Sequence, residues 1–202
     1  MRAAGALAVG GMVAGCNPRP ARIVAPKIDA PQAAAAAVAA CDQDGDGQIA
    51  LAEAARCPSL TAAFAKIDAD RSGQLTAEEI AARIASWSAS GIGITTQTFF
   101  VLLDGKPLAG GRVQLVPESF LADALFPAES GISDAGMCTP TIAGEHLPEG
   151  VSTGIYFGLY RVLVTHPDRA IPGRYHEATE LGMEVCPDYN FYNPDKLQLK
   201  SR

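Results

Sequence analysis

The chain has 202 residues, enough for one or two domains, and 48% of them are hydrophobic. Its 22 acidic residues outnumber its 16 basic ones, and the formal net charge is −6 at pH 7. This charge excludes a predominantly basic surface of the kind that binds nucleic acid.

The N-terminus has the features of an export signal. Arg2 precedes an apolar stretch at residues 3–13, which is too short to span a bilayer. The following Val-Ala-Gly-Cys sequence, residues 13–16, resembles the bacterial lipobox. In that family the chain is cleaved before the cysteine, which then carries the lipid. The resemblance implies a signal peptide over residues 1–15 and a lipid anchor on Cys16, and therefore an exported protein on the periplasmic or surface face of a membrane. The alternatives are an ordinary cleaved signal peptide and a cysteine that stands at this position by chance.

Residues 16–32 predict a tether. They contain four prolines and no apolar period, so they connect the anchor to the first domain rather than contribute to a core.

Residues 42–53 read Asp-Gln-Asp-Gly-Asp-Gly-Gln-Ile-Ala-Leu-Ala-Glu. Ca²⁺ takes about 6–8 oxygen ligands, and a 12-residue loop supplies them from positions 1, 3, 5, 7, 9 and 12, with glycine at position 6 for a sharp turn. Gly47 occupies that turn position, and at position 9 Ala50 leaves room for a water ligand. The predicted protein ligands are the carboxylates of Asp42, Asp44, Asp46 and Glu53 and the backbone carbonyl of Gln48.

A second loop with the same spacing covers residues 68–79, with Gly73 at its turn. Together the two loops resemble the EF-hand calcium-binding family over residues 34–86, and the resemblance implies bound Ca²⁺. The second loop offers three carboxylates where the first offers four, so we expect it to bind more weakly. A pair that keeps the fold without the metal is the alternative. The predicted ligands of the second loop are Asp68, Asp70, Ser72, the backbone carbonyl of Gln74, Thr76 and Glu79.

The helices of this pair, residues 33–87, are unequal. The one entering the first loop is nearly all alanine, which forms a helix readily but buries little apolar surface. Pro58 lies between the loops, so the helix leaving the first loop must be short. We therefore expect a static, calcium-stabilised unit rather than a sensor that opens a large apolar groove.

Five cysteines leave one unpaired, which fits lipidation of Cys16. Disulfides persist in exported proteins. Cys41 and Cys57 flank the first loop, and a bond between them would close it. Cys138 and Cys186 would then pair by elimination, although four cysteines allow three connectivities.

The pattern changes after residues 88–93, Ser-Ala-Ser-Gly-Ile-Gly, which predict a hinge. Residues 94–202 contain short runs rich in β-branched and aromatic residues, separated by Pro/Gly-rich turns. This is typical of an Ig-like β-sandwich. The turn at Asp104-Gly105 indicates a hairpin between the first two runs. The expected strands are residues 95–103, 111–116, 160–165, 179–185 and 196–199.

This second half resembles the carboxypeptidase regulatory-like, or transthyretin-like, sandwich of bacterial surface lipoproteins. The resemblance rests on residues 103–113, on the turn at 133–136 and on residues 158–164, and residues 171–175 and 179–185 extend it. It implies a structural or surface-interaction module without catalysis.

Together these features predict an α+β multidomain chain, with a small all-α EF-hand pair followed by an all-β sandwich. We expect a lipid-anchored calcium-binding protein that is not an enzyme, since His146, His166 and His176 are scattered near turns without a catalytic spacing. An unidentified surface or protein partner is expected. Two alternatives stay open: a calcium-regulated binding module, and an accessory protein for cell-wall polymers or carbohydrate. The second would use stacking by Tyr156, Phe157, Tyr189 and Tyr192.

Overall fold

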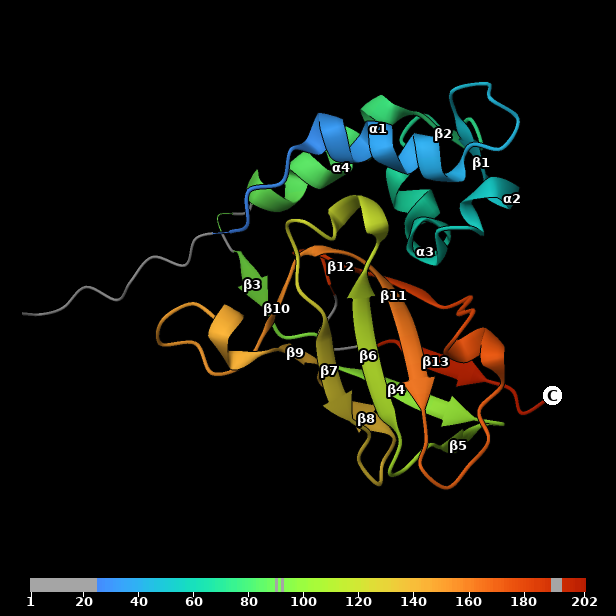
Figure 1. Cartoon of the computed structure of the whole chain (residues 1–202), viewed down its shortest axis with the longest axis vertical. Helices are drawn as coiled ribbons and strands as arrows, with labels where there is room; N and C mark the ends of the chain where they lie inside the picture. The colour runs from blue at the N-terminus through green and yellow to red at the C-terminus, as the bar shows by residue number, and fades with distance from the viewer. Residues whose placement is uncertain (1–24, 90, 92, 190–193) are drawn as a thin grey trace, which may run out of the picture.

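The computed structural model describes residues 25–89, 91, 93–189 and 194–202. The predicted signal peptide, the predicted lipid site at Cys16 and the aromatic Tyr192 lie outside the described residues. The fold is α+β: helices from the first half of the chain gather at one end of two sheets built from the second half (Figure 1).

The helices lie close to the positions expected from the sequence. Helix α1 (Ala30–Cys41) begins three residues before the expected boundary, because the Asp29 carboxylate accepts a hydrogen bond from the backbone N–H of Gln32 at 3.0 Å and caps it. Pro58 stands at the start of α3 (Pro58–Ile67), where its missing N–H costs nothing. Helix α2 (Leu51–Ala54) has four residues, so the prediction of a short helix after the first loop is confirmed. Helix α4 (Ala77–Ala89) follows the second loop.

The strands form two larger sheets and two short pairs. The five-stranded sheet is antiparallel throughout, in the order β12-β11-β6-β7-β9. In the second sheet β4 pairs with β13 in parallel and with β5 and β8 in antiparallel fashion. The bounds are β6 (Arg112–Pro117), β7 (Ala128–Gly131), β9 (Thr141–Ile142), β11 (Gly158–Thr165), β12 (Gly182–Val185), β4 (Phe99–Leu103), β5 (Lys106–Pro107), β8 (Met137–Cys138) and β13 (Lys196–Leu199), with the short pairs β3 (Ile94–Thr95) and β10 (Ile155–Tyr156), and β1 (Ile49–Ala50) and β2 (Gln74–Leu75).

The predicted hairpin between residues 95–103 and 111–116 is wrong in its second strand. Asp104 and Gly105 do form a two-residue turn, both with positive φ, but this turn returns the chain into the two-residue strand β5. The run at 111–116 instead forms β6 of the other sheet, paired with β7 and β11. The alternation of apolar residues therefore predicted the strands but not their partners.

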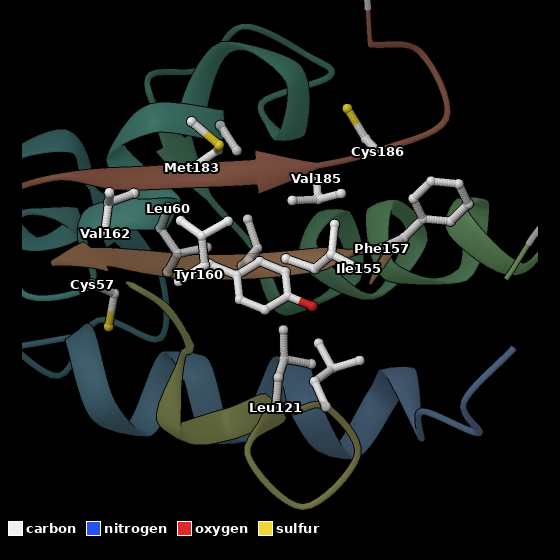
Figure 2. Packing of buried hydrophobic residues seen from close by; sticks show 14 of the residues in the cluster. Cys57, Leu60, Leu121, Ile155, Phe157, Tyr160, Val162, Met183, Val185 and Cys186 are labelled. Atoms are coloured by element: carbon white, nitrogen blue, oxygen red, sulfur yellow. The ribbon is translucent and has the colours of Figure 1, made fainter. Parts of the chain in front are cut away.

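The helices and sheets share one buried cluster. Leu60 of α3, Tyr160 of β11 and Val185 of β12 are all fully buried in it (Figure 2). The approach is close: a Cβ added at Gly182 would overlap the backbone carbonyl of Pro58 at the start of α3. Because only glycine permits this contact, the first turn of α3 rests directly on the backbone of β12.

Candidate metal centre

The two predicted calcium loops lie side by side at the far end of the helical region. The first joins α1 to α2 and the second joins α3 to α4. Their strands β1 and β2 pair antiparallel, with Ile49 opposite Leu75, and both side chains are fully buried. This pairing fixes the register of one loop against the other.

In the first loop the aspartates converge. Oxygens of Asp42, Asp44 and Asp46 lie within 4.8 Å of one another. The two oxygens of Asp42 accept hydrogen bonds from the backbone N–H groups of Gly45 (2.7 Å) and Gly47 (3.0 Å). The loop backbone thus holds the carboxylates around one point, where a cation could sit.

The second loop forms a similar cluster. Oxygens of Asp68, Asp70 and Glu79 lie within 4.8 Å of one another. Asp68 accepts hydrogen bonds from the backbone of Ser72 and Gly73, both at 3.0 Å. The Ser72 hydroxyl donates to the backbone carbonyl of Gln74 at 3.1 Å, so two further predicted ligands lie side by side.

The glutamate at position 12 of each loop accepts hydrogen bonds from the backbone of its own loop, at the same positions in both. One oxygen of Glu53 accepts from the N–H of Gln43 at 2.8 Å, and the other accepts from Ala50 at 2.8 Å. In the second loop Glu79 accepts from Ala69 and Thr76, both at 3.0 Å. Glu53 is not part of the aspartate cluster of its loop, but these bonds turn it into the loop interior.

These contacts keep the glutamates charged. Hydrogen bonds from the backbone of Gln43 and Ala50 hold the pKa of Glu53 below its ordinary value. Partial burial opposes ionisation of Glu79, but hydrogen bonds from the backbone and hydroxyl of Thr76 outweigh it and lower the pKa of Glu79. Ionised carboxylates are the form that a cation requires.

Thr76 was predicted as a ligand, and its hydroxyl is engaged elsewhere. It donates to Glu79 at 2.9 Å and accepts from the Glu79 backbone N–H at 3.2 Å. Threonine and glutamate three residues apart therefore cap the start of α4 reciprocally. The same threonine thus also fixes the orientation of the position-12 carboxylate.

One hydrogen bond links the loops directly. The side-chain amide of Gln74 donates to Asp46 at 3.2 Å. Gln74 was predicted to contribute its backbone carbonyl to the second site, and Asp46 its carboxylate to the first. A predicted ligand of one loop therefore positions a predicted ligand of the other.

The disulfide between Cys41 and Cys57 is confirmed, with its Cα atoms 6.6 Å apart. The predicted bond between Cys138 and Cys186 is wrong, because both are free and buried. The Cys138 thiol lies on β8 and faces the Phe99 carbonyl at 3.6 Å, whereas the Cys186 sulfur follows β12 of the other sheet and faces Lys66 at 3.4 Å. Pairing by elimination fails because one thiol lies in one sheet and the other follows a strand of the other sheet. Burial raises the pKa of each to about 12, so both are protonated at neutral pH.

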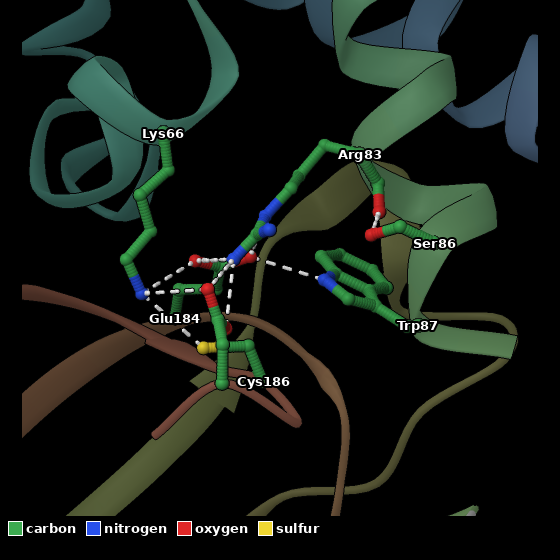
Figure 3. Close-up of polar contacts among 7 residues, drawn as sticks. Lys66, Arg83, Ser86, Trp87, Glu184 and Cys186 are labelled. Atoms are coloured by element: carbon green, nitrogen blue, oxygen red, sulfur yellow. Dashed lines mark hydrogen bonds and ion pairs between the residues drawn. The ribbon is translucent and has the colours of Figure 1, made fainter. Parts of the chain in front are cut away.

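A partly buried ion-pair cluster joins the second loop's helices to the sheet (Figure 3). Glu184 of β12 accepts hydrogen bonds from Arg83 Nε at 2.6 Å and Nη2 at 2.9 Å, and from Trp87 Nε1 at 3.0 Å. Lys66 Nζ lies 3.5 Å from the same carboxylate. The sequence shows no signal for this cluster, since Arg83 and Glu184 are 101 residues apart.

The histidines and the proposed stacking aromatics serve local structure. His166 and His176 contact the backbone carbonyls of Ala109 and Ile171, and the ring of His146 stacks on Phe126. Tyr156 and Phe157 are buried, at 7% and 5% exposure, and therefore offer no open stacking surface for a sugar.

Comparison with known proteins adds no family assignment: no protein-family model, curated protein or solved structure matches the chain. Within the described part of the chain, every helix is too short or too polar to cross a membrane.

Proposed function

We propose that the protein binds two Ca²⁺ ions in a pair of EF-hand loops. The observation that carries this proposal is the set of hydrogen bonds that the two loops share at their first aspartate and last glutamate. In both, the position-1 aspartate accepts from the position-6 glycine, and the position-12 glutamate accepts from the N–H groups at positions 2, 3 and 9. An acidic turn arising by chance would not repeat this set of bonds 26 residues later.

The donor set suits calcium among the common cations. All of the converging side-chain atoms are oxygens, which are the ligands that hard cations take. Asp42, Asp44, Asp46, Glu53 and the carbonyl of Gln48 would hold the first ion. The second would be held by Asp68, Asp70, Ser72, the carbonyl of Gln74, Thr76 and Glu79, and the hydroxyl of Thr76 would also orient Glu79.

Charge gives the binding its energetic reason. Residues 42–79 contain eight acidic and three basic side chains, so without a cation the aspartates of each loop repel one another. Two Ca²⁺ ions would nearly neutralise this region. Calcium modules outside the cell work at about 10⁻⁴ to 10⁻³ M, which corresponds to a structural ion rather than a signal.

The rest of the proposal concerns placement and role. We infer that the chain is an exported lipoprotein anchored at Cys16, with the calcium unit joined to a non-catalytic, transthyretin-like β-sandwich that contacts surface partners. The support is the lipobox-like sequence at residues 13–16 and the disulfide at Cys41, which forms in oxidising compartments. The burial of Tyr156 and Phe157 makes the carbohydrate-binding alternative the weaker one.

The experiment that tests calcium binding is a calorimetric titration of the chelator-stripped full chain, with Cys16→Ser to prevent lipidation. Two binding events are expected, one lost in Glu53→Gln, the other in Glu79→Gln, and both in the double variant. Glu129→Gln, which alters an exposed carboxylate distant from the loops, serves as the matched control. No heat, together with a melting temperature unchanged by millimolar calcium, would overturn the proposal. A rise in hydrophobic-dye binding with calcium would favour the regulated module over the static one.

A further inference from the structure

The buried carboxylate of Glu184 collects its partners from both sides of the second loop. Lys66 lies on α3, two residues before the loop begins at Asp68. Arg83 and Trp87 lie on α4, four and eight residues after Glu79 ends the loop. Residues four apart on a helix share a face, so Glu79, Arg83 and Trp87 follow one stripe of α4 from the loop to the sheet.

The cluster is built to hold its geometry. The Glu184 side chain is 4% exposed and that of Arg83 is 17% exposed, so water competes weakly for their contacts. The pair is bidentate, which fixes the rotation of α4 as well as its distance from β12. Asp188 provides a second carboxylate, 3.1 Å from Arg83 and 3.8 Å from Lys66. The cluster therefore attaches both α3 and α4 to β12 and to the segment that follows it.

Among the described residues, no ion pair joins α1 or α2, the helices that flank the first loop, to the sheet. The side-chain hydrogen bonds described for these two helices remain within the helical region, and α1 packs on α4 and on the 3₁₀ turn at Ser119–Leu121. The constraint on the first loop is the disulfide between Cys41 and Cys57. The two loops thus differ in what determines the spacing of their flanking helices.

We propose that Glu184 is a positioning residue for calcium at the second loop, so that calcium binding there and the docking of α3 and α4 on β12 are thermodynamically coupled. The inference rests on the proposed calcium function. Docking holds Asp68 and Glu79 at the separation that the ion needs, so the loop loses less conformational freedom when it binds. Coupling is reciprocal, and calcium in the second loop therefore tightens the attachment of both helices to the sheet.

The test compares two variants in two backgrounds, all in the full chain with Cys16→Ser. Glu53→Gln leaves only the second loop competent, and Glu79→Gln leaves only the first. In each background Glu184→Gln is compared with Glu129→Gln, which alters an exposed ion pair with Arg112 whose glutamate is 58% exposed. Calcium affinity is measured by calorimetry, and folding is checked by circular dichroism.

Glu184→Gln should weaken calcium at the second loop by about 5-fold or more, the lower end of typical coupling between sites. It should leave the first loop unchanged, and Glu129→Gln should change neither. Arg83→Lys keeps the charge but loses the bidentate contact, so it should give an intermediate loss at the second loop. That variant also provides the same readout should Glu184→Gln fail to fold.

Trp87 offers an independent readout, because it is the chain's single tryptophan and donates to Glu184. Calcium should shift its fluorescence in the wild type and in Glu53→Gln, but not in Glu79→Gln. Unchanged second-loop affinity in both Glu184→Gln and Arg83→Lys, with calcium still bound, would overturn the coupling and leave the proposed function intact. Absence of calcium binding in the parent chain would overturn both.

Discussion

The two acidic loops share hydrogen bonds within the loop and differ in the contacts that hold their flanking helices. In each, the N–H of the position-6 glycine donates to the first aspartate, and the N–H at position 2 donates to the last glutamate. The first loop is closed by a disulfide that spans a sequence separation of 16, and it leads into a helix of four residues. The second leads into a helix of 13 residues that is fastened to a strand about a hundred residues away by Glu184.

This difference shows that one local motif can be supported by two kinds of constraint. A covalent bond between near neighbours acts mainly by restricting the unfolded chain. An ion pair between distant elements acts only once the sheet has formed. A displacement of Glu184 in the sheet would then also displace the helices that flank the second loop. The first loop therefore depends on redox conditions, and the second depends on the integrity of the β region.

The largest expected effect comes from breaking the ion pair between Arg83 and Glu184. Arg83→Ala leaves the Glu184 carboxylate buried with its bidentate partner removed, so we expect the free energy of unfolding to fall by about 3–5 kcal/mol. Arg112→Ala breaks a pair that is 66% and 58% exposed and should cost about 1 kcal/mol or less. Denaturant unfolding monitors both. Equal losses would mean that Glu184 contributes no more than a surface ion pair.

The next largest effect comes from removing the disulfide between Cys41 and Cys57. Replacing both Cys41 and Cys57 by alanine should lower the free energy of unfolding by about 3 kcal/mol, the value expected for a closed loop of this length. Calcium affinity should fall more at the first loop than at the second. A reducing agent should lower the melting temperature of the wild type and leave that of the double variant unchanged. A similar response of both proteins to the reducing agent would contradict this assignment.

The smallest expected change in stability comes from substitutions at position 4 of each loop. Gly45 and Arg71 both have positive φ, of 78° and 61°, a conformation that costs about 1 kcal/mol or more for a residue with a Cβ. Arg71→Gly should therefore stabilise the second loop by about 1 kcal/mol, and Gly45→Ala should destabilise the first by a similar amount.

The space around Gly45 makes this pair a clean comparison. A Cβ there would meet no atom within 4 Å, so steric crowding does not contribute and the backbone conformation alone decides the cost. Thermal melts with and without calcium measure both changes. A stabilising Gly45→Ala would show that the loop backbone relaxes out of the left-handed region in solution.

The parts of the site that could be predicted from sequence are those in which partners lie close along the chain. The ligand positions within 42–53 and 68–79 depend on spacing inside a 12-residue segment, and the structure brings together the aspartates of each loop. The disulfide at Cys41 is of the same kind, since its partner is 16 residues away. The sequence spacing did not indicate that the hydroxyl of Thr76, a predicted ligand, would also cap the start of α4.

The sequence by itself determined the helices, the two acidic loops and five of the described strands, which are β4, β6, β11, β12 and β13. Each of these depends on a short period, a turn residue or a fixed local spacing. Only the tertiary structure decided which strands pair, where Cys138 and Cys186 lie, and that Glu184 receives Lys66, Arg83 and Trp87. These contacts join residues far apart in the chain, and their free energy appears only when the whole core has closed, so no local pattern encodes them.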